Sequence, residues 1–247
     1  MRQLFPSAVA EPDVGGLYAY PAVSSAGPSW VRGNMVESVD GAAALDGRSG
    51  GLSGDADKAV FRILRSQADV VVAGSGTVTS EHYRPAQASA TAAGLRAGRP
   101  ATPPIAVITG SLKLDLSTSL FTDAPPEART IVITSESCPP DRRKAAAEVA
   151  DVIVAGSEQV DLAAAVAALA ERGRHRVLCE GGPHLLAQFA AAGCLDELCV
   201  TISPLLAGGD AGRILTGPAL PGGLPLELGH VLEDEGFLLC RYLVQAG

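Results

Sequence analysis

The sequence lacks any apolar run long enough to cross a membrane. Its 247 residues are 47% hydrophobic, which is enough for a substantial core, yet Glu, Arg, Gly or Pro interrupts each apolar run. None reaches the ~20 residues that a spanning helix needs. The opening stretch MRQLFPSAVAEPD also lacks the long apolar core of a signal peptide. We therefore expect a cytoplasmic protein with no membrane partner.

Basic residues are too scattered for a nucleic-acid surface. The formal net charge is -8, and the longest basic cluster, Arg142-Arg143-Lys144, stands at an expected helix start. We therefore expect no nucleic-acid partner, and a small-molecule substrate is favoured.

The cysteines and histidines lack the spacing of a metal site. The five cysteines form no C-x-x-C pair, and the four histidines form neither H-E-x-x-H nor H-x-x-E-H. Free cysteines in a reducing compartment behave as small apolar residues. We therefore expect no metal ion.

Short β-branched runs alternate with helical patterns along most of the chain. The strand-like runs are VVVAG (70–74), IAVIT (105–109), TIVIT (130–134), DVIVAG (151–156), RVLCE (176–180) and LCVTISPLL (198–206). The helical patterns cover residues 55–67, 140–150, 161–172 and 184–193. This alternation predicts crossover connections and a largely parallel sheet flanked by helices.

The end of the chain predicts antiparallel pairing. The segment LELGHVLEDEGFLLCRYLV contains two strand-like runs joined by the turn signal Asp234-Glu235-Gly236, which is typical of a hairpin. Residues 85–104 are rich in Ala, Gly and Pro, and the sheet pattern resumes after them, which indicates an excursion loop. We therefore expect a single α/β domain over residues 1–247 with a mixed, mostly parallel sheet.

The stretch CEGGPHLL (179–186) places an acid, two glycines and a proline where a strand passes into a helix. The free amides of a helix start attract anions, and Gly181 and Gly182 let the backbone approach a phosphate closely. Pro183 suits the first helical turn. On this motif alone two interpretations stay open, a pyrophosphate cradle and a plain tight turn.

A second strand, VVVAGSGTV (70–78), also runs into glycines. Two glycine-bearing strand ends of one parallel sheet are expected to meet at its carboxyl edge, where ligands of open α/β sheets bind. The segment departs from the dinucleotide fingerprint G-x-G-x-x-G, because Thr79 replaces the third glycine. An ordinary Rossmann domain is therefore disfavoured.

A third segment, SVDGAAALDGRSGGLSGDAD (38–57), contains two Asp-Gly turns and ends in the helix-cap signal Ser53-Gly54-Asp55. It predicts either a surface loop with a helix cap or a mobile loop over a ligand.

Four motifs, in this order, are similar to the pyrimidine reductase family of riboflavin biosynthesis: SVDG (38–41), LRSQADVVVAGSGTV (64–78), EGGPHLL (180–186) and LDELCVTISPLLAGG (195–209). The resemblance covers about residues 30–247 and implies a dihydrofolate reductase-like fold. The family corresponds to the reductase half of a bifunctional deaminase-reductase. The zinc signature of the deaminase half is missing here, so the resemblance implies a stand-alone reductase.

The activity that the resemblance implies is the NADPH-dependent reduction of 5-amino-6-(5-phosphoribosylamino)uracil to its ribitylamino product. Two alternatives stay open: reduction of dihydrofolate or another pterin-like compound, and a non-catalytic NADP(H)-binding regulatory domain. Related reductases pair, so the resemblance also implies a homodimer.

Cofactor contacts are implied mainly at the two glycine-bearing corners. Thr77 matches the threonine of the family's G-x-G-T-V segment, where its hydroxyl bonds a phosphate or ribose, or else caps a turn. The implied cofactor-binding residues are Gly74, Gly76, Thr77, Val78, Gly181, Gly182, Pro183, His184 and Leu185. In addition, the hydroxyl of Ser135 at a strand end suits the 2′-phosphate of NADPH, with Arg142 or Arg143 nearby and Glu136 as an opposing charge.

Substrate contacts are implied at a second set of residues: Asn34, Ser49, Ser53, Arg65, Arg84 and Glu180. A guanidinium would suit the substrate phosphate, and Glu180 would accept hydrogen bonds from the pyrimidine or ribityl group, or else hold the turn.

Glu81 and Asp40 are the candidate proton donors, and Asp40 alternatively shapes the turn with Gly41. Where the family continues with Asp-Asp-Pro and later Leu-Thr-x-Arg, this sequence has VTSEHYRP (78–85), which leaves the exact substrate open.

Overall fold

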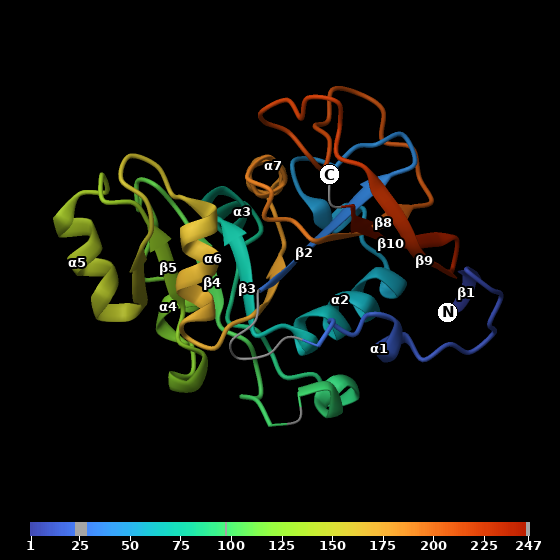
Figure 1. Ribbon diagram of the computed structural model, residues 1–247, viewed down its shortest axis with the longest axis horizontal. Coiled ribbons are helices and arrows are strands. Elements are labelled where there is room, and N and C mark those ends of the chain that lie inside the picture. The colour runs from blue at the N-terminus through green and yellow to red at the C-terminus, as the bar shows by residue number, and fades with distance from the viewer. Residues whose placement is uncertain (23–28, 97, 246–247) are drawn as a thin grey trace. The chain divides into compact units, whose positions relative to one another are not determined.

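The computed structural model describes residues 1–22, 29–96 and 98–245 (Figure 1). The chain divides into two compact units. The first contains Met1–Tyr20, Val31–Leu64 and Glu180–Gly247, and the second contains Pro21–Trp30 and Arg65–Cys179. The single domain expected from the sequence stays a prediction.

The strands of the second unit are parallel in each described pair. Their order is β7-β3-β4-β5-β6. The bounds are Val70–Gly74 for β3, Ile105–Ile108 for β4, Ile131–Thr134 for β5, Asp151–Val154 for β6 and Arg176–Cys179 for β7. All residues of β4 and β5 are buried, as in strands covered on both faces. The structure thus confirms the predicted parallel strands, which Figure 1 shows side by side for β3, β4 and β5.

Helices follow the strands of this unit, as the alternation predicted. They are α3 (Ser75–Ser80), α4 (Ser119–Thr122), α5 (Pro140–Val149) and α6 (Leu162–Ala170). α6 begins after Asp161, whose carboxylate accepts a hydrogen bond from the Ala164 amide. Within residues 1–22, 29–96 and 98–245, no helix has the length and apolar character needed to span a membrane.

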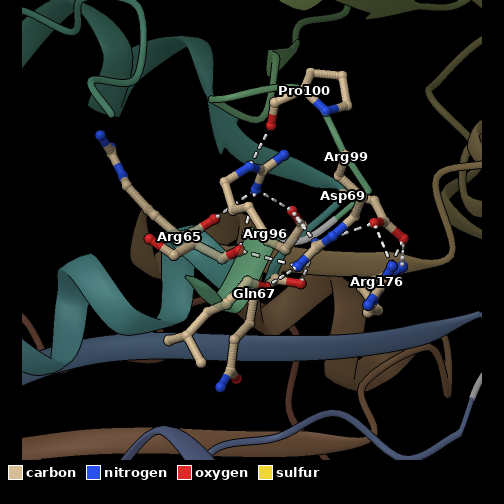
Figure 2. A network of polar contacts seen from close by, with 10 residues as sticks. Arg65, Gln67, Asp69, Arg96, Arg99, Pro100 and Arg176 are labelled. Atoms are coloured by element: carbon tan, nitrogen blue, oxygen red, sulfur yellow. Dashed lines mark hydrogen bonds and ion pairs between the residues drawn. The ribbon is translucent and has the colours of Figure 1, made fainter. Parts of the chain in front are cut away.

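The excursion loop 85–104 is fastened to the C-terminal end of α2 (Asp55–Gln67) by two arginines (Figure 2). Arg96 and Arg99 donate to backbone carbonyls that end the helix, and Arg99 also pairs with Asp69 at 3.3 Å. The accepting carbonyls belong to Arg65, Ser66, Gln67 and Ala68. Cationic groups are favoured at a helix C-terminus because the last carbonyls and the helix dipole attract them. Ala97, within this loop, lies outside the described residues.

Replacing Arg96 with alanine is expected to lower the free energy of unfolding by about 1.5–3 kcal/mol, because hydrogen bonds from a charged donor are lost at a buried site. Urea denaturation measures the change. The matched control is Arg172→Ala, since Arg172 is exposed and donates to the Ala168 carbonyl of its own helix. Equal urea midpoints for the two variants would show that the hydrogen bonds from Arg96 to the end of α2 do not stabilise the fold.

The first unit combines antiparallel and parallel pairing. Its strand order is β1-β9-β10-β8-β2, and the pairs are antiparallel from β1 to β8 and parallel between β8 and β2. The bounds are Arg2–Phe5 for β1, Trp30–Ser38 for β2, Glu197–Ser203 for β8, Leu226–Asp234 for β9 and Phe237–Val244 for β10. β9 and β10 confirm the predicted terminal hairpin, whose turn contains Glu235 and Gly236.

Opposite charges lie in register near the starts of β2 and β8. Arg32 pairs with Glu197 across the two strands, both side chains are fully buried, and Arg241 on β10 binds the second carboxylate oxygen at 2.7 Å. Burial acts to raise the pKa of Glu197, but Arg32 and Arg241 outweigh it and hold the pKa below its ordinary value. This buried ion network was not predicted from the sequence.

The N-terminal segment contacts the buried ion network of Arg32, Glu197 and Arg241. The guanidinium carbon of Arg32 lies 3.9 Å from the centre of the Tyr20 ring, and Arg241 donates to the carbonyl of Leu17. Tyr18 is buried edge-on against His230, with ring centres 4.6 Å apart. The segment also contributes the short helix α1 (Val14–Leu17) and the edge strand β1.

Candidate functional site

The glycine corner at 181–182 belongs to the first unit and precedes helix α7 (Pro183–Ala191). Gly181 has a φ of +80°, and a Cβ there would lie 2.9 Å from the sulfur of Met35 on β2. Glycine is thus required by backbone conformation and by close packing. The Gly181–Gly182 peptide bond is cis. These features are sufficient to explain the glycines of CEGGPHLL as parts of a tight turn. The phosphate-binding role of the segment stays a prediction.

The first turn of α7 offers mainly backbone to a ligand. Gly182 is the N-cap and Pro183 occupies the first turn, as predicted. Leu185 is buried with its side chain in the core, whereas His184 is exposed. Glu180, just before the corner, is buried. The Leu185 side chain is therefore part of the core, and the predicted cofactor contacts of this turn stay predictions.

The remaining predicted residues of the first unit lie on β2 and in the segment before α2. Asn34 and Ser49 are half-buried, Asn34 opposite Cys199 in the register of β2 and β8. The hydroxyl of Ser53 donates to the Asp57 carboxylate at 2.5 Å. This contact ties Ser53 to the first turn of α2, and its substrate role stays a prediction.

Asp40 is held by the loop that follows β8. Its carboxylate accepts hydrogen bonds from the amides of Ala207 and Gly208, at 3.0 and 2.7 Å, and from the hydroxyl of Ser38. The Ala207 amide, the Ser38 hydroxyl and the Gly208 amide lower the pKa of Asp40 to about 2. A carboxyl that is ionised at neutral pH has no proton to give. These hydrogen bonds favour the loop-shaping alternative for Asp40, and its role as a proton donor stays a prediction.

Residues 204–217, which we call the strap, connect two predicted parts of the site within the first unit. The amide of Ala43, in the loop after β2, donates to the carbonyl of Gly212 at 2.8 Å. Four residues later, the amide of Thr216 donates to the carbonyl of Pro183 in the first turn of α7 at 3.3 Å. The sequence indicated only the start of the strap, through its resemblance motif, and not these contacts.

The second glycine corner belongs to the second unit and joins β3 to α3. Gly74 is the N-cap of α3, Gly76 is exposed, and a Cβ at Gly76 would meet open space. The carbonyl of Thr77 accepts a hydrogen bond from the Glu81 amide. Val78 is 7% exposed, so its side chain packs in the core, and its cofactor contact stays a prediction.

Arg65 lies against the segment that follows α3. Its guanidinium carbon is 5.6 Å from the centre of the Tyr83 ring, and Figure 2 shows the side chain pointing away from the Arg96 and Arg99 clamp. Glu81 is half-buried and Arg84 is exposed. Arg65 thus lies against the predicted 77–84 segment through Tyr83, for which the sequence carried no signal of its own.

Ser135 is fully buried in the loop after β5. Its hydroxyl lies 2.9 Å from that of Ser137 and donates to the carbonyl of Glu158. Arg142 donates instead to the carbonyl of Ser111. A buried hydroxyl with internal partners is unavailable to a 2′-phosphate, so the structure disfavours the predicted cofactor role of Ser135.

The predicted residues are thus distributed over both units. Asn34, Asp40, Ser49, Ser53 and the residues from Glu180 to Leu185 belong to the first, and Arg65, Gly74, Gly76, Thr77, Val78, Glu81, Arg84 and Ser135 to the second. The expected meeting of the two glycine corners stays a prediction.

Comparison with known proteins decides the family. Residues 29–235 match the model of the RibD C-terminal domain. The chain belongs to this family. The match confirms the resemblance on which the sequence-based site assignment rests.

The chain is also similar to individual proteins and to solved structures. The chain is 31% identical over 182 residues to the 2,5-diamino-6-ribosylamino-4(3H)-pyrimidinone 5′-phosphate reductase of Methanothermobacter thermautotrophicus, covering 74% of this chain and 81% of that protein. A pyrimidine reductase-like protein from Corynebacterium diphtheriae has a TM-score of 0.83 at 26% identity, covering 95% of this chain and 99% of that one. Dihydrofolate reductase from Enterococcus faecalis, solved with NADP(H), shares the fold, with a TM-score of 0.51 at 11% identity over 88% of this chain and 97% of that one. The predicted dihydrofolate reductase-like α/β fold is confirmed.

Proposed function

We propose that this chain is an NADPH-dependent reductase of a phosphorylated ribosylaminopyrimidine in riboflavin biosynthesis. The observation that carries the proposal is the family match over residues 29–235. The Methanothermobacter relative supports it, because its name specifies reduction of a diaminopyrimidinone ribosyl phosphate. That compound and the aminouracil implied by the sequence share the ribosylamino 5′-phosphate and differ in one exocyclic group of the ring.

The glycine corners fit a dinucleotide cofactor. Gly181 leaves no room for a side chain, and the Cα of Gly76 borders open space. We assign Gly182 and Pro183, in the first unit, to the diphosphate of NADPH, which supplies a hydride from its nicotinamide ring when bound. The cofactor contacts implied at Gly76 and Thr77, in the second unit, stay predictions. The protein residues bind and orient the reactants.

The proton that the product requires comes from Glu81 or from water. Asp40 is not assigned this role, because its carboxylate already accepts hydrogen bonds from the amides of the strap. Glu180 is buried beside the glycine corner, where a carboxylate suits the hydroxyls of a ribosyl or ribityl group.

Loss of NADPH absorbance tests the activity. The purified protein is expected to oxidise NADPH with the diaminopyrimidinone ribosyl phosphate, the aminouracil ribosyl phosphate, or both, and not with dihydrofolate. Oxidation with dihydrofolate alone would support the pterin alternative. Tight NADPH binding without any turnover would support a regulatory domain.

We also propose a homodimer that pairs through the sheet of the first unit. Leu198 and Ile202 on β8 lie opposite Tyr242 and Leu238 on β10, and all four side chains are half-buried on one face. Light scattering after gel filtration is expected to give about twice the chain mass of 25.1 kDa. A monomer at micromolar concentration would contradict this.

A further inference from the structure

The N-terminal segment, residues 1–20, lies outside the part of the chain that matches the family. It is held to the first unit near both of its ends. Near its start, β1 pairs with β9. Near its end, Arg241 on β10 donates to the carbonyl of Leu17, and the buried ring of Tyr18 packs edge-on against His230 on β9. His230 is therefore one of the contacts through which the sheet holds the segment.

The surroundings of the His230 ring suit its neutral form. The residue is 2% exposed, and its Nε2 atom is buried with no hydrogen-bond partner among the residues that the structure describes. Both ring nitrogens of a protonated histidine carry a hydrogen, and the hydrogen on Nε2 would have no acceptor here. The edge-on contact with Tyr18, by contrast, needs no charge on the imidazole. A proton on this ring would therefore be buried without compensation.

The charges around His230 also oppose its protonation. Arg241 lies directly opposite His230 in the register of β9 and β10, and Arg32 on β2 acts on the same ring. Both guanidiniums already bond the carboxylate of Glu197 on β8. Two cations thus share this carboxylate, and a protonated His230 would add a third cation to the cluster.

The pKa of His230 follows from this environment. Burial lowers the pKa from 6.5 to about 4, Arg241 and Arg32 act in the same direction, and Glu197 opposes them. The hydroxyl of Tyr18 stays protonated, because burial raises its pKa. A histidine whose pKa is lowered by packing stabilises that packing above its ordinary pKa. The contribution is lost as the pH falls through the ordinary value towards the lowered one.

We infer that His230 is a pH-sensitive latch of the N-terminal segment: in mild acid the protonated ring releases Tyr18, and with it residues 1–20, from the sheet. Histidine is suited to such a role because small changes of its environment move its titration across the range near neutral pH. The inference does not depend on the proposed function.

Two carboxylates that also help to hold the segment respond at lower pH than an ordinary histidine. Glu233 pairs with Arg2 of β1, and the Gly236 amide and Arg2 lower its pKa. Glu197 anchors Arg241, and the pKa of Glu197 is likewise below its ordinary value. Both carboxylates therefore stay charged between about pH 7 and pH 5, the range in which release of the latch is expected.

Hydrogen exchange of residues 1–20, measured by mass spectrometry and corrected for the intrinsic effect of pH on exchange, tests the latch. Between pH 7 and pH 5, the opening equilibrium of the segment in the wild-type protein is expected to increase on the order of tenfold. His230→Phe keeps a ring against Tyr18 and cannot take a proton, so its opening should be equal at the two pH values. His175→Gln replaces a buried histidine of the second unit and should keep the wild-type response.

Nuclear magnetic resonance of the His230 ring in the wild-type protein provides a measurement that needs no substitution at this position. Its signal is identified by its proximity to the Tyr18 ring, and we expect a titration midpoint below pH 5. Tyr18→Ala uncovers the ring and should raise the midpoint. A wild-type midpoint near 6.5, equal opening of the wild-type segment at the two pH values, or a pH response that His230→Phe retains would overturn the inference.

Discussion

Replacing Gly182 with aspartate is expected to weaken NADPH binding by more than ~100-fold, because a negative charge about 4 Å from a phosphate is worth several kcal/mol near a protein surface. The variant is designed to fold. Position 182 has an extended backbone, with φ of -64° and ψ of -172°, and it is the N-cap of α7, where aspartate is a favoured residue. Isothermal titration with NADPH measures the loss.

Gly182→Asn is the matched control, since asparagine has the size and capping ability of aspartate without its charge. We expect Gly182→Asn to retain much more affinity than Gly182→Asp at equal melting temperature. If the two variants and the wild type bind NADPH equally, position 182 does not face the diphosphate, and CEGGPHLL is only a structural turn.

Replacing Glu197 with alanine is expected to lower the free energy of unfolding by about 3–5 kcal/mol, because Arg32 would be left as a buried charge without its partner. Arg32 is fully buried, so water cannot take the place of the carboxylate. Guanidinium denaturation at neutral pH measures the change.

Glu233→Ala provides the comparison, since Glu233 pairs with Arg2, which is mostly exposed, and solvent-exposed ion pairs contribute little to stability. A Glu197→Ala variant that unfolds at the same denaturant concentration as Glu233→Ala would show that the buried network does not stabilise the first unit.

Elements with a strong local pattern were predictable from the sequence. The expected helix over 55–67 is α2 (Asp55–Gln67), and the expected hairpin is β9 with β10. The edge strand β1 was missed, because its four residues carry no alternating apolar pattern and only one of them is buried. Its partner is β9, more than two hundred residues away, and local periodicity does not reveal such a partner.

The same limit explains the corrections in the site. The sequence indicated Asp40 and Ser135 as polar residues at strand ends, but their hydrogen-bond partners come from distant segments, the strap for Asp40 and Glu158 for Ser135. A side chain whose polar atoms already bond such a partner is less available for the binding or catalytic role that its residue type suggests. Gly181 was predicted to let the backbone approach a ligand. The reason that the structure shows for glycine there, close packing against Met35 on β2, could not be predicted from the sequence.

Hydride transfer itself is the central claim, and isotope labelling tests it most directly. The protein is incubated with NADPH carrying deuterium at both hydrogen positions of the reactive nicotinamide carbon and with the ribosylaminopyrimidine phosphate, and the product is analysed by mass spectrometry. The account predicts one deuterium in the ribityl chain of the product. A product without deuterium, or no ribityl product while the protein binds NADPH, would contradict it.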